Sequence, residues 1–128
     1  MTVRDAIKLV GISKSFDLKG DTCINVLTDI NLKISNNELV AITGRSGSGK
    51  STLLHIMSGL TKPTSGSVFI NGRDISLLSE KDVAQFRNCE IGFVFQSFFL
   101  EPAMTAWENV SLPLIVQKKS IAERRGRA

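Results

Sequence analysis

Residues 44–52 read Gly-Arg-Ser-Gly-Ser-Gly-Lys-Ser-Thr, which is a complete G-x-x-x-x-G-K-S/T phosphate-binding loop. An apolar run typical of a β-strand, residues 39–43, leads into the loop, and a helix-type run, residues 53–57, leads out of it. The glycines let the chain curl so that successive backbone N–H groups point inward, and the new helix adds its positive N-terminal end. This arrangement predicts a site for the phosphates of a nucleoside triphosphate rather than a flexible glycine-serine turn.

The side chains of the loop have distinct expected contacts. Lys50 is expected to reach the β- and γ-phosphates, and the Ser51 hydroxyl to coordinate Mg²⁺. A nucleoside triphosphate and Mg²⁺ are therefore the predicted ligands. The residues predicted to bind the nucleotide in this segment are Gly44, Ser46, Gly47, Ser48, Gly49, Lys50, Ser51 and Thr52.

The composition is that of a globular chain forming one domain or part of one. Of its 128 residues, 42% are apolar and 22% are charged, and the formal net charge is +4. Part of the basic excess lies at Arg124, Arg125 and Arg127, a run more typical of a solvated helix face than of a nucleic-acid site. No run approaches the ~20 apolar residues of a transmembrane helix. We therefore expect no nucleic-acid partner, and any membrane association to come through another protein.

Cysteine and histidine usage gives no sign of a disulfide or a zinc site. Cys23 and Cys89 lie far apart, and the single histidine, His55, offers no metal-binding spacing with them. Free, buried thiols in a reducing cytoplasm are expected. His55 itself is expected on the surface of the helix that follows the loop.

The pattern around the loop predicts strands before it and helices after it. Alternating apolar and polar residues predict strands over residues 7–16, 26–27, 30–34 and 67–70, and nearly all of residues 91–96 are apolar, as in a buried strand. Asn36-Asn37 and Asn71-Gly72 are turn signals. Pairs with capping-box spacing predict three helix starts: Ser79 with Asp82, Thr105 with Glu108, and Ser120 with Glu123.

This order of motifs resembles the nucleotide-binding subunit of ABC transporters. The resemblance rests on the loop, on residues 63–72 (Pro-Thr-Ser-Gly-Ser-Val-Phe-Ile-Asn-Gly) and on residues 92–96 (Gly-Phe-Val-Phe-Gln). Residues 86–88, 105–110 and 112–114 look like the lipoprotein-releasing and macrolide-efflux branch. The implied fold is an α/β P-loop NTPase of the ABC type: an antiparallel β subdomain, plus a partial RecA-like sheet with the phosphate-loop helix. The implied cofactors are ATP and Mg²⁺.

The resemblance also implies roles for three residues outside the loop. Phe16 falls where the family stacks an aromatic ring on adenine, with a core aromatic as the alternative. Val26 falls where a small apolar residue abuts the base or ribose, with simple core packing as the alternative. Gln96 matches a glutamine that contacts Mg²⁺ or the attacking water, with a polar strand end as the alternative. Lys50 and Gln96 are thus the expected catalytic residues, and Ser51 and Gln96 the expected metal ligands.

The same resemblance implies partners and a location. Residues 97–102, from Ser97 to Pro102, are unusually apolar and fall where the family receives a helix of the membrane subunit; packing in the core is an equally good reading. A transmembrane permease and a second ATPase subunit are the implied partners. The implied location is cytoplasmic, on the inner face of the cell membrane through that permease.

Several family motifs are absent from the sequence. It has no L-S-G-G-Q signature, no following strand that ends in Asp with a catalytic Glu after it, and no switch histidine. We expect residues 1–128 to be the N-terminal portion of the nucleotide-binding domain, truncated before the signature, and to bind ATP without cleaving it efficiently. Residues 39–43 would then form an unpaired apolar edge, so the chain is expected to dimerise by exchanging or adding strands, or to be only marginally soluble. Two alternatives are a non-catalytic nucleotide-binding or interaction module and a soluble ABC ATPase of DNA repair or translation.

Overall fold

The computed structural model describes residues 5–18, 22–97 and 99–128. The chain forms two compact units, Met1–Ser79 and Glu80–Ala128. The first contains all the strands of the described residues together with the phosphate loop, and the second is helical.

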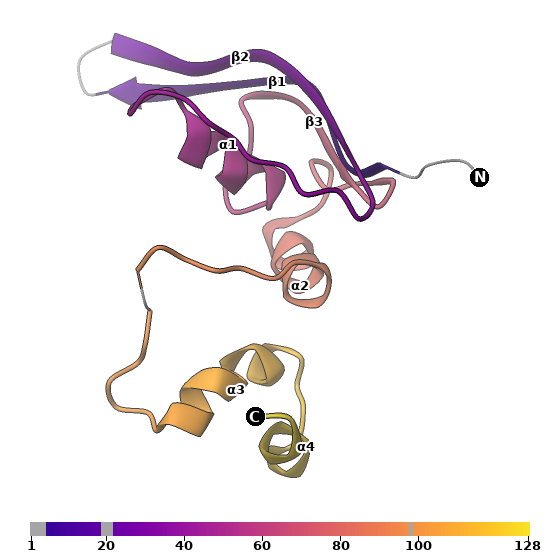
Figure 1. Cartoon of the computed structure of the whole chain (residues 1–128), viewed down its shortest axis with the longest axis vertical. Helices are drawn as coiled ribbons and strands as arrows, with labels where there is room; N and C mark the ends of the chain where they lie inside the picture. The colour runs from indigo at the N-terminus through magenta and orange to yellow at the C-terminus, as the bar shows by residue number, and fades with distance from the viewer. Residues whose placement is uncertain (1–4, 19–21, 98) are drawn as a thin grey trace. The chain divides into compact units, whose positions relative to one another are not determined.

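The first unit is a four-stranded antiparallel sheet with one helix beside it (Figure 1). The sheet order is β2-β1-β3-β4, so the long β1–β2 hairpin carries the short β3–β4 hairpin on one side. The strands predicted over residues 7–16 and 67–70 are confirmed, and the two predicted segments at 26–27 and 30–34 form one continuous strand. The elements are β1 (Asp5–Leu18), β2 (Thr22–Ser35), α1 (Lys50–Met57), β3 (Ser65–Ile70) and β4 (Arg73–Asp74).

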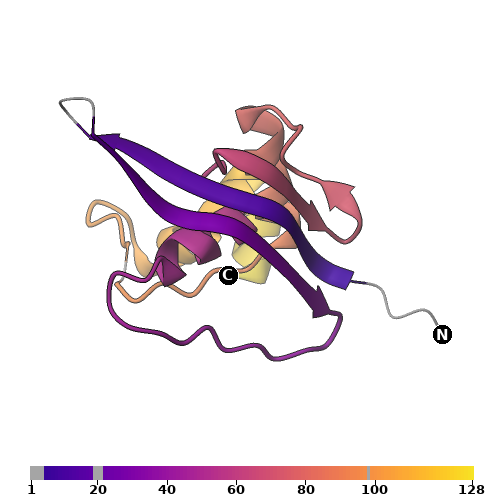
Figure 2. The same cartoon turned by 90° about the horizontal axis from the view of Figure 1, so that it is seen from above.

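The core of this unit lies between one face of the sheet and α1, which runs beneath the two long strands in Figure 2. Leu9 and Val68 pair across β1 and β3 and are 2% and 1% exposed. Ile56 and Met57 of α1 are also buried. Each fully buried aliphatic side chain contributes about 1.5–3 kcal/mol. The helix that follows the phosphate loop is therefore fixed to the sheet by apolar packing.

A bulge at Gly11 changes which side chains of β1 face this core. Between Leu9 and Ile12 the register with β2 shifts by one residue, and Gly11 adopts a φ of 60°. Residues at odd positions, such as Leu9, face the core before the bulge, and residues at even positions, such as Ile12, face it afterwards. The register shifts again between Ile12 and Lys14 and between Lys14 and Ser15, but there the extra residues lie on β2. Alternation along β1 therefore places Lys14 and Phe16 on the same face as Ile12.

Hydrogen bonds hold the strand beyond the bulge. The Gly11 N–H donates to Asn31 Oδ1 at 2.9 Å. Thr64, just before β3, donates its N–H to the Ser13 carbonyl at 2.8 Å, and its hydroxyl oxygen accepts the Ser15 N–H at 3.0 Å. The end of β1 that carries Phe16 is therefore fixed on both sides.

Both asparagine turn signals are confirmed. Asn37 adopts a φ of 63° in the turn that follows β2. Asn71 and Gly72 adopt φ values of 49° and 80° between β3 and β4, which are the two left-handed residues of a tight hairpin turn.

The second unit consists of α2 (Glu80–Glu90), α3 (Ala106–Val116) and α4 (Ile121–Arg127), which begin where the three capping-box pairs predict. Two of the boxes are confirmed in detail: Glu108 Oε2 accepts the Thr105 N–H at 2.8 Å, and Glu123 Oε2 accepts the Ser120 N–H at 3.0 Å. Hydrogen bonds from the Thr105 hydroxyl and N–H lower the pKa of Glu108. Asn88 Nδ2 donates to the Pro113 carbonyl at 3.0 Å, which ties α2 to α3.

Two predicted strands, residues 39–43 and 91–96, are not strands in the structure. Leu39 is 99% exposed and Val94 is fully exposed, although both have the apolar character of a buried strand. A strand forms only against a partner, and neither run pairs with a strand among the described residues. Both runs have a sequence suited to strand pairing, but no strand in the described part of the chain pairs with them.

The cysteines also differ from expectation, whereas the histidine does not. Cys23 and Cys89 are free, as predicted, but both are exposed rather than buried, because Cys23 lies near the end of the β1–β2 hairpin and Cys89 on the outer side of α2. His55 is exposed on α1, as predicted.

Within residues 5–18, 22–97 and 99–128, no helix has the length and apolar character needed to cross a membrane.

Candidate functional site

The phosphate loop leads directly into α1, whose first residue is Lys50 and whose N-cap is Gly49. This cap makes no side-chain hydrogen bond, and the first turn carries no acidic residue. The Leu53 N–H is satisfied within the helix by the Gly49 carbonyl at 2.8 Å. The earlier N–H groups and the positive end of the helix dipole are thus not neutralised by a capping side chain, which suits an anion.

Lys50 lies across its own loop. Its Nζ donates to the Gly44 carbonyl at 3.0 Å and to the Arg45 carbonyl at 2.8 Å. The side chain therefore brings its ammonium group back over the curled backbone, where a bound triphosphate would meet it. Ser46, Ser48 and Ser51 are exposed and Thr52 is half-buried, so the hydroxyl groups of the loop also remain accessible.

Gly49 brings the loop against β2. It adopts a φ of 88°, and a Cβ at this position would lie 2.9 Å from Leu27 Cδ2, 3.1 Å from the Val26 carbonyl oxygen and 3.2 Å from Val26 Cγ1. Only glycine combines that backbone conformation with so close an approach. The structure therefore places Val26 against the end of the phosphate loop, next to the residues predicted to bind phosphate.

Phe16 lies on the face of the sheet that meets the loop. Lys14 pairs in register with Leu27, the residue that contacts Gly49, and Phe16 follows two positions later on the same face, opposite Ile24. The Phe16 ring is 42% exposed, which does not fit a core aromatic. The Lys14 Nζ lies 4.9 Å from the centroid of that ring.

Gln96 belongs to the second unit, separate from the unit that holds the loop. It is exposed and lies in a segment without regular structure, residues 91–97.

The phenylalanine rings of this segment contact one another. Phe93 and Phe95 stack with centroids 5.5 Å apart, and Phe95 meets Phe99 edge-on at 5.1 Å. In residues 97–102, Phe99 and Leu100 are 75% and 64% exposed, whereas Phe98 lies outside the described residues. Phe99 and Leu100 are therefore not packed in a core, which was the alternative to a surface that receives another protein.

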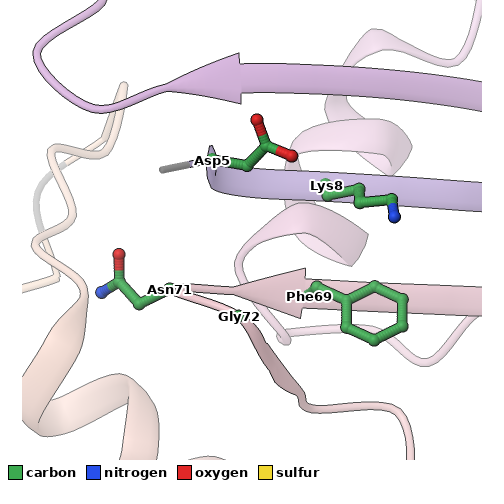
Figure 3. A pocket seen from close by; sticks show the side chains of 5 residues that line it. All are labelled: Asp5, Lys8, Phe69, Asn71 and Gly72. Carbon is green, nitrogen blue, oxygen red and sulfur yellow. The ribbon is translucent and has the colours of Figure 1, made fainter. Parts of the chain in front are cut away.

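A pocket that was not predicted from the sequence lies at the other end of β1 from Phe16. Its volume is about 250 Å³, and its lining comes from the start of β1, the end of β3 and the β3–β4 turn, as Figure 3 shows. Lys8 Nζ lies 5.6 Å from the centroid of the Phe69 ring. The lining residues are Asp5, Lys8, Phe69, Asn71 and Gly72. No group of three or more His, Cys, Asp or Glu side chains suited to a metal occurs among the described residues.

Comparisons with known proteins agree with the loop and with the fold. The chain is 49% identical over 122 residues to the macrolide export ATP-binding/permease protein MacB of Bdellovibrio bacteriovorus, which covers 95% of this chain and 19% of that protein. It is 44% identical over 123 residues to the lipoprotein-releasing system ATP-binding protein LolD 1 of Chlorobium chlorochromatii, which covers 95% of this chain and 50% of that protein. The predicted branch is therefore confirmed.

A solved structure matches with a TM-score of 0.85 and 44% identity, over 94% of this chain and 53% of that one. It is described as a dimeric, post-hydrolysis state of the ATP-binding cassette MJ0796 bound to ADP and Pi. The predicted ABC-type P-loop fold class is confirmed by this match. The chain spans about half the length of this cassette and of the lipoprotein-releasing relative. It spans 19% of the length of the macrolide export protein.

The model of the ABC transporter family matches residues 27–127, which includes the loop, α1 and every helix of the second unit. Since family match, fold match and phosphate-loop geometry all point the same way, the chain belongs to the ABC transporter family.

Proposed function

We propose that this chain binds ATP together with Mg²⁺ through residues 44–52, as part of an ATPase subunit that drives a transporter. The observation that carries the proposal is the position of Lys50. Its ammonium group lies over the curled loop, within hydrogen-bond distance of two loop carbonyls, at the uncapped start of α1. A triphosphate would there meet a fixed positive charge, backbone donors and the helix dipole together.

The residues present fit a nucleotide with a magnesium ion. Mg²⁺ prefers oxygen ligands and usually keeps waters while bridging phosphates, so a site with few protein ligands suits it. Ser51, exposed in the first turn of α1, would supply a hydroxyl ligand. When bound, the ion neutralises charge on the phosphates. Lys50 would orient the β- and γ-phosphates, whereas the role of Gln96 toward the ion or the attacking water stays a prediction.

The base would lie on the sheet. Phe16 offers a partly exposed ring on the face that meets the loop, and Val26 lies against Gly49 at the end of the loop. Stacking on Phe16 is worth about 1–3 kcal/mol per base and discriminates weakly between bases. Selectivity for ATP over other triphosphates is therefore expected to be small.

Coupling to a membrane partner is the second part of the proposal. The exposed apolar side chains Phe99 and Leu100, continuous with the Phe93–Phe95 stack, form a surface of the kind that docks another protein. We assign it to a permease subunit, with a second ATPase subunit completing the nucleotide site. The protein would then lie on the cytoplasmic, inner face of the cell membrane.

Calorimetric titration with ATP and Mg²⁺ tests the proposal. Binding is expected to one site per chain, while phosphate release is expected to stay at the level of a Lys50→Ala control, because the sequence lacks the aspartate and glutamate that complete the family's catalytic site. Absence of binding would overturn the nucleotide assignment. Turnover well above the control would overturn the expectation that the chain alone does not cleave ATP efficiently.

The chain is also expected to associate with itself through residues 39–43. Leu39 is 99% exposed and its neighbour Val40 is 40% exposed, so this run can pair with the same run of a second copy. Light scattering over a range of concentrations should show dimers or larger species. Leu39→Asp should shift them toward monomer, whereas Leu77→Asp, at another exposed leucine of the same unit, should not. A wild-type monomer at every concentration would contradict this expectation.

A further inference from the structure

Strand β1 carries two lysines that each lie over a phenylalanine ring, one on each face of the sheet. Lys14 Nζ lies 4.9 Å from the centroid of Phe16, and Lys8 Nζ lies 5.6 Å from the centroid of Phe69. Lys8 precedes the Gly11 bulge and is adjacent to the buried Leu9, so it points away from the core. The two pairs are chemically alike and differ in where they lie.

The Lys14–Phe16 pair lies on the face that meets the phosphate loop. Lys14 pairs with Leu27, and Leu27 is the nearest neighbour of a Cβ built at Gly49. The Lys8–Phe69 pair instead lines the pocket of Figure 3, at the other end of β1. Only the first pair is therefore adjacent to the proposed nucleotide site.

We propose that Lys14 is a positioning residue for the nucleotide base: its ammonium group covers one face of the Phe16 ring and fixes the ring so that the base stacks on the other face. This inference rests on the proposed function, because it concerns the base of the nucleotide bound at residues 44–52. Lys14 acts through Phe16 and has no role in phosphate transfer.

Two physical effects favour such an arrangement. A partly exposed phenylalanine loses rotamer freedom when a ligand fixes it, and a ring already held by a cation loses less. A cation on one face of an aromatic ring also withdraws electron density from it, which favours stacking of an electron-rich purine on the opposite face. A cation–π contact at an exposed site is worth a factor of about two to five in an equilibrium constant.

Two ligands separate this role from a general effect of charge. ATP presents a base and a triphosphate, whereas inorganic tripolyphosphate presents only the phosphates. Affinities for both, with Mg²⁺, should be measured for the wild type, Lys14→Met, Lys14→Arg and the matched control Lys8→Met. Thermal unfolding of each variant checks that the sheet is intact.

Lys14→Met should weaken ATP binding about two- to fivefold and leave tripolyphosphate binding unchanged, because the methionine keeps the apolar chain and removes the cation. Lys14→Arg should restore ATP affinity, and Lys8→Met should change neither ligand. Equal weakening of both ligands would show that Lys14 acts as a charge on the phosphates, and no weakening of either would show no role; each result overturns the inference. A wild type that binds neither ligand would instead refute the proposed function itself.

Discussion

Replacing Lys50 with alanine should lower ATP affinity by about two orders of magnitude or more. A hydrogen bond to a charged group contributes about 1.5–3 kcal/mol, and a lysine that bridges two phosphates makes at least two of them. The side chain is well placed to do so, since its Nζ already lies 3.0 Å and 2.8 Å from two carbonyl oxygens of the loop. Phosphates would take over these donors without a large movement of the backbone.

Calorimetry with ATP and Mg²⁺ measures the effect, and Lys62→Ala is the matched control. Lys62 is an exposed lysine shortly after α1, so its loss lowers the net charge equally without touching the loop. The control should bind ATP nearly as the wild type does. If Lys50→Ala kept wild-type affinity, the phosphates would have to bind elsewhere, and the assignment of residues 44–52 would fail.

Features that depend on neighbouring residues could be predicted from the sequence. The loop curls and leads into a helix at Lys50, helices begin after Thr105 and Ser120 with both capping boxes formed, and Asn71-Gly72 makes the hairpin turn. Each of these depends on hydrogen bonds or backbone conformations within a few residues, so the local pattern is sufficient to specify it.

Features that depend on distant partners could not be predicted. Residues 39–43 and 91–96 have the apolar composition of buried strands, but strand formation requires a neighbour that composition does not reveal. The bulge at Gly11 could not be predicted from the sequence pattern either. Alternation over residues 7–16 suggests one uniform strand, yet the core-facing positions change from odd to even at Gly11. Without that change Phe16 would face away from the phosphate loop.

The bulge depends on a second glycine, and replacing Gly66 with alanine should destabilise the first unit by about 2–5 kcal/mol. A Cβ at Gly66 would lie 2.5 Å from the Gly11 carbonyl oxygen, 2.6 Å from the Gly11 carbonyl carbon and 2.6 Å from the Val10 carbonyl oxygen. These are backbone atoms, so no side chain can rotate to make room. Overpacking of this kind costs about 1–3 kcal/mol, and the positive φ of 93° adds about 1–2 kcal/mol.

Gly72→Ala separates the clash from the backbone strain. Gly72 adopts a φ of 80°, but a Cβ there would meet nothing within 4 Å, so this variant should lose only about 1–2 kcal/mol. Urea unfolding of both variants measures this difference in stability.

ATP titration under native conditions tests the consequence for binding. Since Gly66 packs on the bulge that turns Phe16 toward the loop, Gly66→Ala should weaken ATP binding more than tripolyphosphate binding. Gly72→Ala should weaken the binding of neither ligand. Equal stability of the two variants would show that β1 and β3 separate easily at Gly11, and that the contact between the two glycines does not fix the orientation of Phe16.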